Sequence, residues 1–409
     1  MIMAVVLPEI FAQIPRYPLL YNHSSPIHSL PRTSQRATST TPRLALFAKR
    51  EDQSSPLACA GNKYRKLEYI IPDILSVSPQ HHDHEHAETP TPSPGAATTL
   101  VTEGAVQSNH TVQVSALARQ LGLNALVLLQ KGTGAGFRNA RDPDAFLRSG
   151  NVQINRMLGA EVRVLDEGDP LSRDARPVLD ALRARGQRPY WIPGGASMHA
   201  LGGLGYARAA MEIAVQEKEL RLGGSGRFDY VFVACGSGST VGGLVAGFKL
   251  YEKMRTSSSS TASSSSATTT ANAAPPRQII GVLNSPTNPK PYHEARVLAF
   301  ARRAGALIGL DPETDLGVED VRLDDRFVGT GYGVLDAEAR EALETMARTE
   351  GVILDPVYTA KVARGMLHWV QQGEVVADAR RNGHHSDEVN VLFIHTGGQA
   401  ALGAYADVI

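Results

Sequence analysis

The chain alternates between short apolar runs and longer amphipathic segments, and this alternation constrains its fold more than any other feature. Strands are expected at 44–48, 99–102, 125–129, 161–165, 190–193, 230–234, 278–283 and 391–395. Helices are expected at 109–121, 144–158, 203–220, 240–254, 291–306, 336–350 and 358–372. Continuous apolar strands separated by helices predict an α/β protein with mostly parallel sheets that helices cover on both faces.

Two segments interrupt this alternation. Residues 78–98 contain a histidine-rich stretch at 81–86 followed by Thr-Pro repeats, and residues 256–276 consist mostly of Ser, Thr and Ala. Neither composition can bury a core, so both are expected to be disordered surface insertions. We interpret the histidines as a solvated, opportunistic chelator and predict no metal site.

The length of 409 residues predicts two domains. We expect a small α/β domain at 60–190 and a large cofactor-binding domain at 191–409, which the segment 1–59 joins. The cofactor is expected in the cleft between them.

The formal net charge of zero disfavours a nucleic-acid partner, and the sequence has no apolar span of about 20 residues that would cross a membrane. Cys59 and Cys235 are the only cysteines, which indicates free thiols in a reducing compartment. We expect the cytosol. An arginine-containing, acid-poor stretch near the start leaves a mitochondrial leader as the alternative.

A Gly-Ser-Gly-Ser-Thr turn directly follows the strand expected at 230–234 and opens a helix. Backbone N–H groups at a helix start, with hydroxyls beside them, are suited to binding a phosphate. A dinucleotide fingerprint would need glycine where the chain has Val241, which disfavours a nicotinamide dehydrogenase. The alternative is a tight structural turn. The residues of this phosphate loop are Gly236, Ser237, Gly238, Ser239 and Thr240.

Lys63 lies behind a Gly-Asn turn and opens an amphipathic helix. Because the N-terminus of a helix repels cations, this position favours the neutral amine that Schiff-base chemistry requires. The alternative is a surface lysine, and Arg65 and Lys66 are interpreted as solvated or anion-contacting. A reactive amine together with a phosphate site predicts pyridoxal 5'-phosphate as the cofactor.

Further polar candidates lie at other junctions between a strand or loop and a helix. Ser108 and Asn109 follow an apolar strand, where they could be a simple helix cap or could contact substrate and cofactor. Tyr332 and Tyr358 lie in turns, where packing is the alternative to a role in the site.

Taken together, these segments resemble the 1-aminocyclopropane-1-carboxylate deaminase and D-cysteine desulfhydrase family. These are pyridoxal-phosphate enzymes of fold type II, with the two-domain tryptophan synthase β-like fold. The matching segments span almost the whole chain and are found at 14–19, 48–52, 61–69, 107–109, 192–197, 201–206, 355–358 and 397–398.

The resemblance implies a role for each candidate residue. Lys63 would bind the cofactor covalently, Asn109 would contact the pyridine hydroxyl oxygen, and residues 236–240 would hold the phosphate. Ser108, Tyr332 and Tyr358 would line the substrate side. The resemblance also implies a small amino-acid substrate and a homodimer.

Two departures from the deaminase pattern bear on the substrate. The deaminases have glutamate and leucine where this chain has Thr359 and Thr396, and both hydroxyls resemble the desulfhydrases. A neutral hydroxyl at the ring nitrogen leaves that nitrogen unprotonated, which weakens carbanion stabilisation but suffices for loss of a good leaving group. Two smaller departures, Ala60 and His110, have no assigned effect.

The sequence therefore predicts α,β-elimination from D-cysteine, which gives pyruvate, ammonia and hydrogen sulfide. The alternative enzyme is a 1-aminocyclopropane-1-carboxylate deaminase, which gives 2-oxobutanoate and ammonia. A protein that binds the cofactor without turnover is the alternative of a different class. Its lysine or phosphate loop should be damaged, and neither is damaged here.

Overall fold

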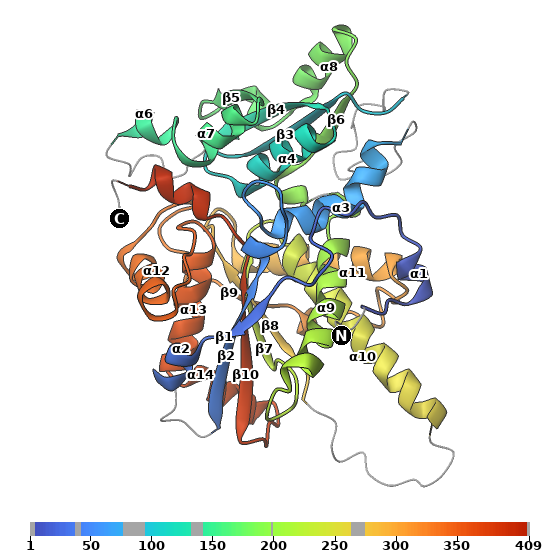
Figure 1. The fold of residues 1–409 in the computed structure, drawn as a ribbon, viewed down its shortest axis with the longest axis vertical. Coiled ribbons are helices and arrows are strands. Elements are labelled where there is room, and N and C mark those ends of the chain that lie inside the picture. Colours follow the sequence, from blue (N-terminus) through green and yellow to red (C-terminus); the bar gives the residue numbers. More distant parts are fainter. Residues whose placement is uncertain are drawn as a thin grey trace.

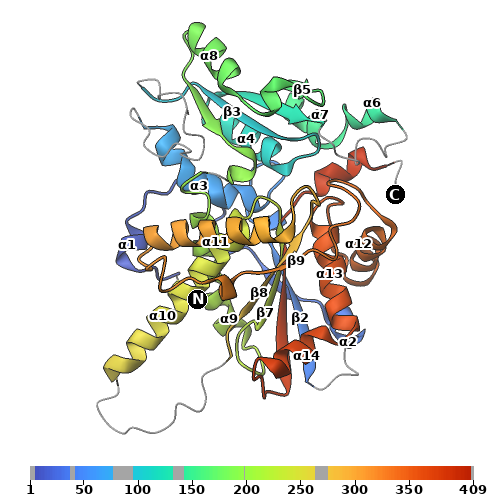
Figure 2. The same ribbon diagram turned by 180° about the vertical axis from the view of Figure 1, so that it is seen from behind.

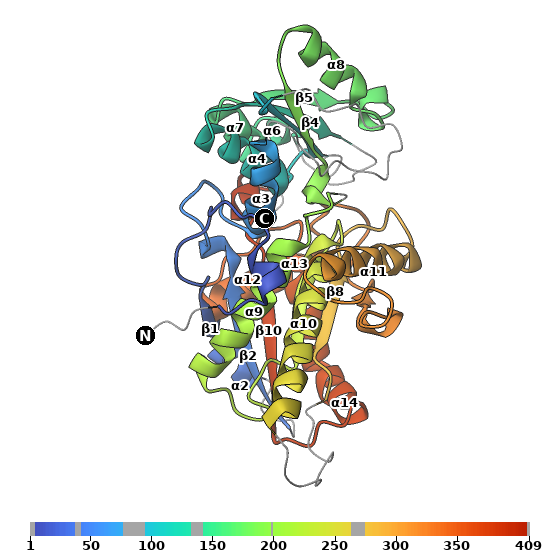
Figure 3. The same cartoon turned by 90° about the vertical axis from the view of Figure 1, so that its right-hand side faces the viewer.

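A computed structural model describes residues 5–36, 42–76, 95–131, 142–197, 199–262 and 275–406. Two β-sheets lie one above the other along the long axis of the molecule, and helix α3 (Asn62–Ile74) lies between them (Figure 1). The edge-on view in Figure 3 shows the same order. The predicted α/β class is confirmed. The domain boundaries at residues 60 and 191 stay a prediction.

The lower sheet has six strands in the order β1-β2-β10-β7-β8-β9. Every neighbouring pair is parallel except β1 and β2. The central strand β10 comes from the end of the chain and pairs with β2 from its beginning. The strands are β1 (Ile27–Ser29), β2 (Arg43–Arg50), β7 (Tyr230–Cys235), β8 (Gln278–Leu283), β9 (Arg322–Asp324) and β10 (Glu388–His395).

Helices cover both faces of this sheet, as its unbroken apolar strands predict. Alternate residues of the strands point to opposite sides: Val231 and Leu392 join one core, and Phe232 and Phe393 join the other. Figure 2 shows α11 crossing one face of the sheet. The helices are α9 (Leu204–Leu220), α10 (Ser239–Ala262) and α11 (Lys290–Leu307) on the first side, and α12 (Ala337–Glu350), α13 (Thr359–Gln371) and α14 (Glu374–Arg381) on the second.

The upper sheet has four parallel strands in the order β5-β4-β3-β6. Its strands are β3 (Thr99–Ala105), β4 (Asn124–Gln130), β5 (Glu161–Leu165) and β6 (Pro189–Ile192). The helices beside it are α4 (Asn109–Gln120), α6 (Pro143–Phe146), α7 (Gly150–Met157) and α8 (Arg176–Ala184), and the N-terminal helices are α1 (Glu9–Ala12) and α2 (Pro31–Arg36). Within the described part of the chain, no helix is both long enough and apolar enough to span a bilayer.

Several predicted elements differ from the structure. The single helix expected at 144–158 is divided into α6 and α7 near Gly150, whose φ of +58° suits glycine. Helix α10 continues through Ala262, so the prediction of disorder from residue 256 is wrong for its first seven residues. The three-residue strands β1 and β9 are too short to give a sequence signal. The histidine-rich stretch lies outside the described residues.

Helix α3 is fixed from below by helix α9, which approaches its backbone closely at Gly205. A Cβ atom on Gly205 would lie 2.0 Å from the carbonyl oxygen of Arg65, so any larger residue would push the helices apart. Arg65 itself is buried, which corrects the expectation that it is solvated; the alternative, contact with an anion, agrees with its two carboxylate partners.

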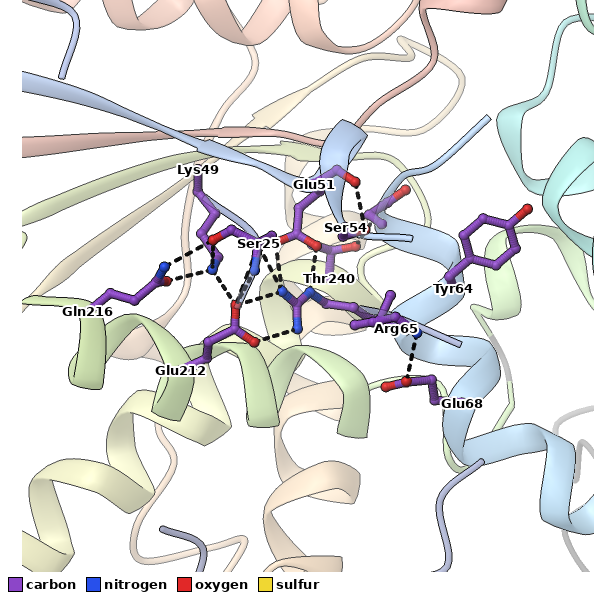
Figure 4. A network of polar contacts seen from close by, with 12 residues as sticks. Ser25, Lys49, Glu51, Ser54, Tyr64, Arg65, Glu68, Glu212, Gln216 and Thr240 are labelled. Carbon is purple, nitrogen blue, oxygen red and sulfur yellow. Dashed lines mark hydrogen bonds and ion pairs between the residues drawn. The ribbon is translucent and has the colours of Figure 1, made fainter. Parts of the chain in front are cut away.

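The Arg65 guanidinium lies between two buried carboxylates, as Figure 4 shows. It donates to both oxygens of Glu212 on α9, at 3.0 and 2.9 Å, and to both oxygens of Glu51, one of them at 3.0 Å. Lys49 on β2 donates to Glu212 as well and to Gln216 at 2.7 Å. The cluster therefore joins β2, α3 and α9.

Two cations balance two anions in this cluster, so no net charge is buried. Burial alone would raise the pKa of Glu212, but Arg65 and Lys49 lower it below its ordinary value. Glu212 therefore contributes stability above the pKa of an unfolded glutamate, and this contribution is lost as the pH falls through the lowered folded-state pKa.

Replacing Glu212 with glutamine leaves two buried cations facing one carboxylate. We expect Glu212→Gln to lower the free energy of unfolding by about 3–5 kcal/mol, measured by urea denaturation at neutral pH. The matched control is Glu161→Gln, which breaks an exposed pair with Arg163 and should change it by less than about 1 kcal/mol. Equal losses in the two variants would contradict a structural role for the cluster.

Candidate active site

A cavity of about 1370 Å³ lies where the carboxyl ends of strands from both sheets meet. In parallel α/β sheets, ligands bind at this edge. The structure brings ten of the predicted site residues to the cavity wall: Lys63, Ser108, Asn109, Gly236, Ser237, Gly238, Thr240, Tyr332, Tyr358 and Thr396.

Lys63 is the second residue of α3, and the start of this helix is held by the end of β10. The N–H of Asn62 donates to the carbonyl of Thr396 at 3.1 Å, and Gly61 pairs with Gly397 in an isolated β-bridge. A Cβ on Gly61 would lie 2.6 Å from the Thr396 oxygen, which explains the glycine before Asn62. These contacts fix the backbone from which Lys63 reaches into the cavity.

Burial lowers the pKa of Lys63 to about 8, which brings the neutral amine within reach at physiological pH. A lowered pKa is therefore present, as predicted, and desolvation is its largest cause.

The phosphate loop lies between β7 and α10, as predicted, with Gly238 at a φ of +92°. Gly195 separates this loop from Lys63. A Cβ on Gly195 would lie 3.0 Å from Ser237 Oγ and 3.7 Å from Lys63 Nζ, so both atoms border one small region. The amine and the loop are therefore close enough for one small cofactor to reach both.

Lys66 is fully buried, which corrects the expectation that it is solvated and leaves contact with an anion. Its Nζ donates to Ser239 Oγ at 2.8 Å and to the carbonyl of Gly195 at 3.2 Å. No carboxylate in the described part of the chain forms an ion pair with it. Burial and the neighbouring Lys63 lower the pKa of Lys66 well below its ordinary value, so an anion at the loop would stabilise the charged form of Lys66. The sequence signal is its position three residues after Lys63, on the same face of α3.

Ser108 and Asn109 come from the upper sheet, at the start of α4. Ser108 is the N-cap, and its hydroxyl accepts from the N–H of His110 at 3.3 Å. The Oδ1 of Asn109 accepts from Asn151 at 2.7 Å, which leaves its Nδ2 as a donor. Asn109 therefore fits the predicted contact with a cofactor oxygen. The cap and the functional interpretation of Ser108 are compatible.

Tyr332 and Tyr358 meet in the cavity, although 26 residues separate them. Their hydroxyls are hydrogen-bonded, and the rings pack edge to face with centroids 5.8 Å apart. Burial raises the pKa of Tyr358, while the hydroxyls of Tyr332 and Ser108 oppose this. Ser108, at an end of the upper sheet, lies close to Tyr358, which precedes a helix of the lower sheet. Both sheets therefore contribute to one polar wall of the cavity.

The two threonines that distinguish this chain have different environments. Thr396 borders the cavity at the end of β10. Thr359 is fully buried, and its hydroxyl donates to Asp355 Oδ1 and accepts from the Asp355 N–H, both at 2.7 Å. The structure therefore places Thr396, and not Thr359, at the cavity wall.

Sequence reasoning missed Asn284, which follows β8 and borders the cavity. Both polar atoms of its buried side chain make no hydrogen bond to any described residue. The amide is therefore free to bind a ligand. A lone asparagine at the end of a strand gave no signal that could have identified it. No group of three or more metal-binding side chains occurs among the described residues.

The model of a family described as pyridoxal-phosphate dependent enzymes matches residues 19–397. Proteins named 1-aminocyclopropane-1-carboxylate deaminase are similar over nearly the whole chain. One from Methylobacterium nodulans is 35% identical over 392 residues, covering 95% of this chain and 96% of that protein. One from Burkholderia vietnamiensis is 36% identical over 401 residues, covering 97% and 98%.

Solved structures give the same result. The crystal structure of an ACC deaminase homologue superposes with a TM-score of 0.70 at 27% identity and covers 98% of both chains. Diaminopropionate ammonia lyase from Escherichia coli superposes with a TM-score of 0.56 at 17% identity, covering 100% of this chain and 93% of the other, and so supports the fold alone.

The site fits pyridoxal 5'-phosphate. Lys63 would supply the amine for its aldehyde, and the loop at 236–240 with the buried Lys66 would supply donors for its phosphate. Asn109 offers a donor for the ring hydroxyl oxygen. Both parts that a non-catalytic protein would have lost are intact.

Attachment of the cofactor to Lys63 should depend on pH. The neutral amine is the nucleophile, so the rate of attachment to the apoprotein should rise through pH 8 and level off above it. Borohydride reduction at each pH, followed by peptide mass mapping, measures modification of residue 63. Lys63→Arg should show no attachment. A rate that is flat between pH 7 and 9 would contradict the lowered pKa.

Loss of the buried cation at the phosphate loop should weaken cofactor binding. We expect Lys66→Gln to raise the dissociation constant of pyridoxal 5'-phosphate roughly 10- to 100-fold, because a charge-assisted contact is lost. Titration followed by visible absorption measures it. The control is Lys218→Gln, which removes an exposed lysine of α9 and should leave affinity unchanged. Unchanged affinity in Lys66→Gln would sink the assignment.

Proposed function

Because the chain belongs to the family of pyridoxal-phosphate dependent enzymes, we propose that it deaminates a small amino acid, with 1-aminocyclopropane-1-carboxylate as the first candidate substrate. The observation that supports this substrate is the match to deaminases over nearly the full length of both chains. These relatives favour the alternative named above over D-cysteine.

The reaction opens the cyclopropane ring and consumes one water molecule, and it gives 2-oxobutanoate and ammonia. When bound, pyridoxal 5'-phosphate supplies an electron-withdrawing ring joined to the substrate nitrogen. The remaining work is to bind the substrate, exclude water and move protons, and the residues of this chain perform it.

Lys63 is the proton carrier in this proposal. Once substrate has released its amine, a pKa of about 8 leaves a substantial neutral fraction near that pH, and the neutral amine can accept a proton. The carbon that bears the nitrogen in 1-aminocyclopropane-1-carboxylate has no hydrogen, so Lys63 would act at a ring methylene. In D-cysteine it would act at the α-carbon.

Ser108 and the two tyrosines would handle the rest of the substrate. The hydroxyl of Ser108 would bind the carboxylate, because it lies at the start of α4 where N–H groups also point outward. The hydrogen-bonded hydroxyls of Tyr332 and Tyr358 would hold the proton that the departing carbon or sulfur receives.

D-Cysteine is the second candidate, and Thr396 is the observation that favours it. The resemblance places leucine here in deaminases, whereas this chain has a threonine at the cavity wall. Thr359 supports D-cysteine only because this position lacks the glutamate of the deaminases. Its own hydroxyl is bonded to Asp355. The products would be pyruvate, ammonia and hydrogen sulfide, again with one water consumed.

The homodimer and the cytosolic location expected from the sequence stay predictions. Size-exclusion chromatography with light scattering measures the first, and imaging of the tagged protein in its own cell measures the second.

Purified holoenzyme should release 2-oxobutanoate and ammonia from 1-aminocyclopropane-1-carboxylate in a side-by-side assay with D-cysteine, in which sulfide and pyruvate are measured. Lys63→Ala should lose both activities. This variant also serves as the control for reactions that the free cofactor catalyses. Sulfide release from D-cysteine without formation of 2-oxobutanoate would make D-cysteine the proposed substrate. The absence of both products would overturn it.

Restoring the deaminase residues provides a matched comparison. We expect the double variant Thr359→Glu/Thr396→Leu to raise the ratio of cyclopropane to D-cysteine turnover by about tenfold or more, because a carboxylate near the ring nitrogen favours its protonated form. In the control variant Thr359→Gln/Thr396→Leu, glutamine has the size of glutamate without its charge. This variant should not raise the ratio.

A further inference from the structure

The turn that presents Tyr332 has no regular structure of its own. It lies between β9 and α12, and both glycines beside Tyr332, Gly331 and Gly333, lack side chains that could anchor it. A turn of this kind samples several conformations unless other groups hold its backbone. Its two flanking carbonyls are held in the structure, each by a different buried side chain.

Lys361 holds the first side. This residue of α13 is fully buried, and its ammonium donates to the carbonyls of Gly331 at 3.0 Å, Val328 at 2.7 Å and Asn284 at 3.3 Å. Three acceptors use all three donors of a lysine. Tyr358 precedes Lys361 by three residues. The start of α13 therefore presents Tyr358 and also anchors the turn that carries Tyr332.

Tyr405 holds the second side. Its hydroxyl donates to the carbonyl of Gly333 at 2.6 Å, and its ring is buried against Phe146 of α6 with centroids 5.4 Å apart. The preceding Ala404 lies against Gly150 of α7, where a Cβ would approach its Cβ to 3.1 Å. Tyr405 therefore connects the Tyr332 turn with helices beside the upper sheet.

We propose that Lys361 and Tyr405 are positioning residues that fix the hydroxyl of Tyr332 against that of Tyr358. Neither residue borders the cavity. They act through the backbone on each side of Tyr332, and Tyr405 makes its position depend on the helices of the upper sheet. The proposal rests on the proposed role of Tyr332, but its structural part can be measured without substrate.

The test uses Tyr405→Phe in the full-length holoenzyme, because this change removes one hydroxyl and keeps the ring on Phe146. Hydrogen exchange of the amides at 328–336 should become at least tenfold faster, while the rest of the lower sheet is unchanged. The matched control is Tyr230→Phe, which removes a buried hydroxyl, bonded to Asp378, at the first residue of β7. It should leave exchange at 328–336 unchanged.

The catalytic part is tested with a double-mutant cycle on the substrate that the enzyme turns over. Tyr405→Phe should lower kcat roughly 10- to 100-fold with little change in KM or in cofactor affinity, because a misplaced group costs rate more than binding. In a Tyr332→Phe background the same change should have almost no further effect. Lys361→Met should behave in the same way, provided that its cofactor content equals that of the unmodified enzyme.

Each outcome separates this inference from the proposed function. Accelerated exchange together with a non-additive loss of kcat supports Lys361 and Tyr405 as positioning residues. Unchanged exchange, or losses of kcat that simply multiply in the double variant, overturns it even if Tyr332→Phe is inactive. If Tyr332→Phe retains full kcat, the role of Tyr332 fails and the catalytic part of the inference fails with it.

Discussion

The site depends on a buried cluster of four charged side chains, Lys49, Glu51, Arg65 and Glu212. Lys63 and Lys66 lie on one face of α3, and Arg65 lies on the opposite face, so whatever holds Arg65 also sets where the two lysines point. Glu51, directly after β2, and Glu212 of α9 hold it. Such a cluster is a poor source of net stability, because desolvation offsets its attraction. Its effect is to define one position for the helix.

A second constraint comes from the strand ends. Thr396 at the end of β10 holds the start of α3 through its carbonyl while its side chain borders the cavity. One residue therefore links the backbone of the cofactor-binding lysine to the part of the wall where this chain departs from deaminases. A substitution there changes the local polarity of the site without disturbing the backbone contact, since that contact uses only main-chain atoms.

Much of this could be predicted from the sequence, because the relevant signals are local. Unbroken apolar strands, the turn at 236–240 and the amine of Lys63 need only neighbouring residues to be interpreted. The hydroxyl of Thr359 and the burial of Lys66 could not be predicted. Thr359 could serve either the cofactor or Asp355, and only the folded backbone decides between them. The hydrogen-bond partners of Lys66, Gly195 and Ser239, are more than 120 residues away along the chain, so no local signal indicates its burial.

The position of β10 has a consequence for how the protein is made. This strand is the last of the described strands along the chain, yet it separates β2 from β7 at the centre of the lower sheet. Until residues 388–395 emerge, the strands on either side have unpaired edges that could associate with other chains. The sheet and the lysine-bearing helix that it anchors can therefore be completed only after residues 388–395 have been synthesised, with a high contact order and slow closure.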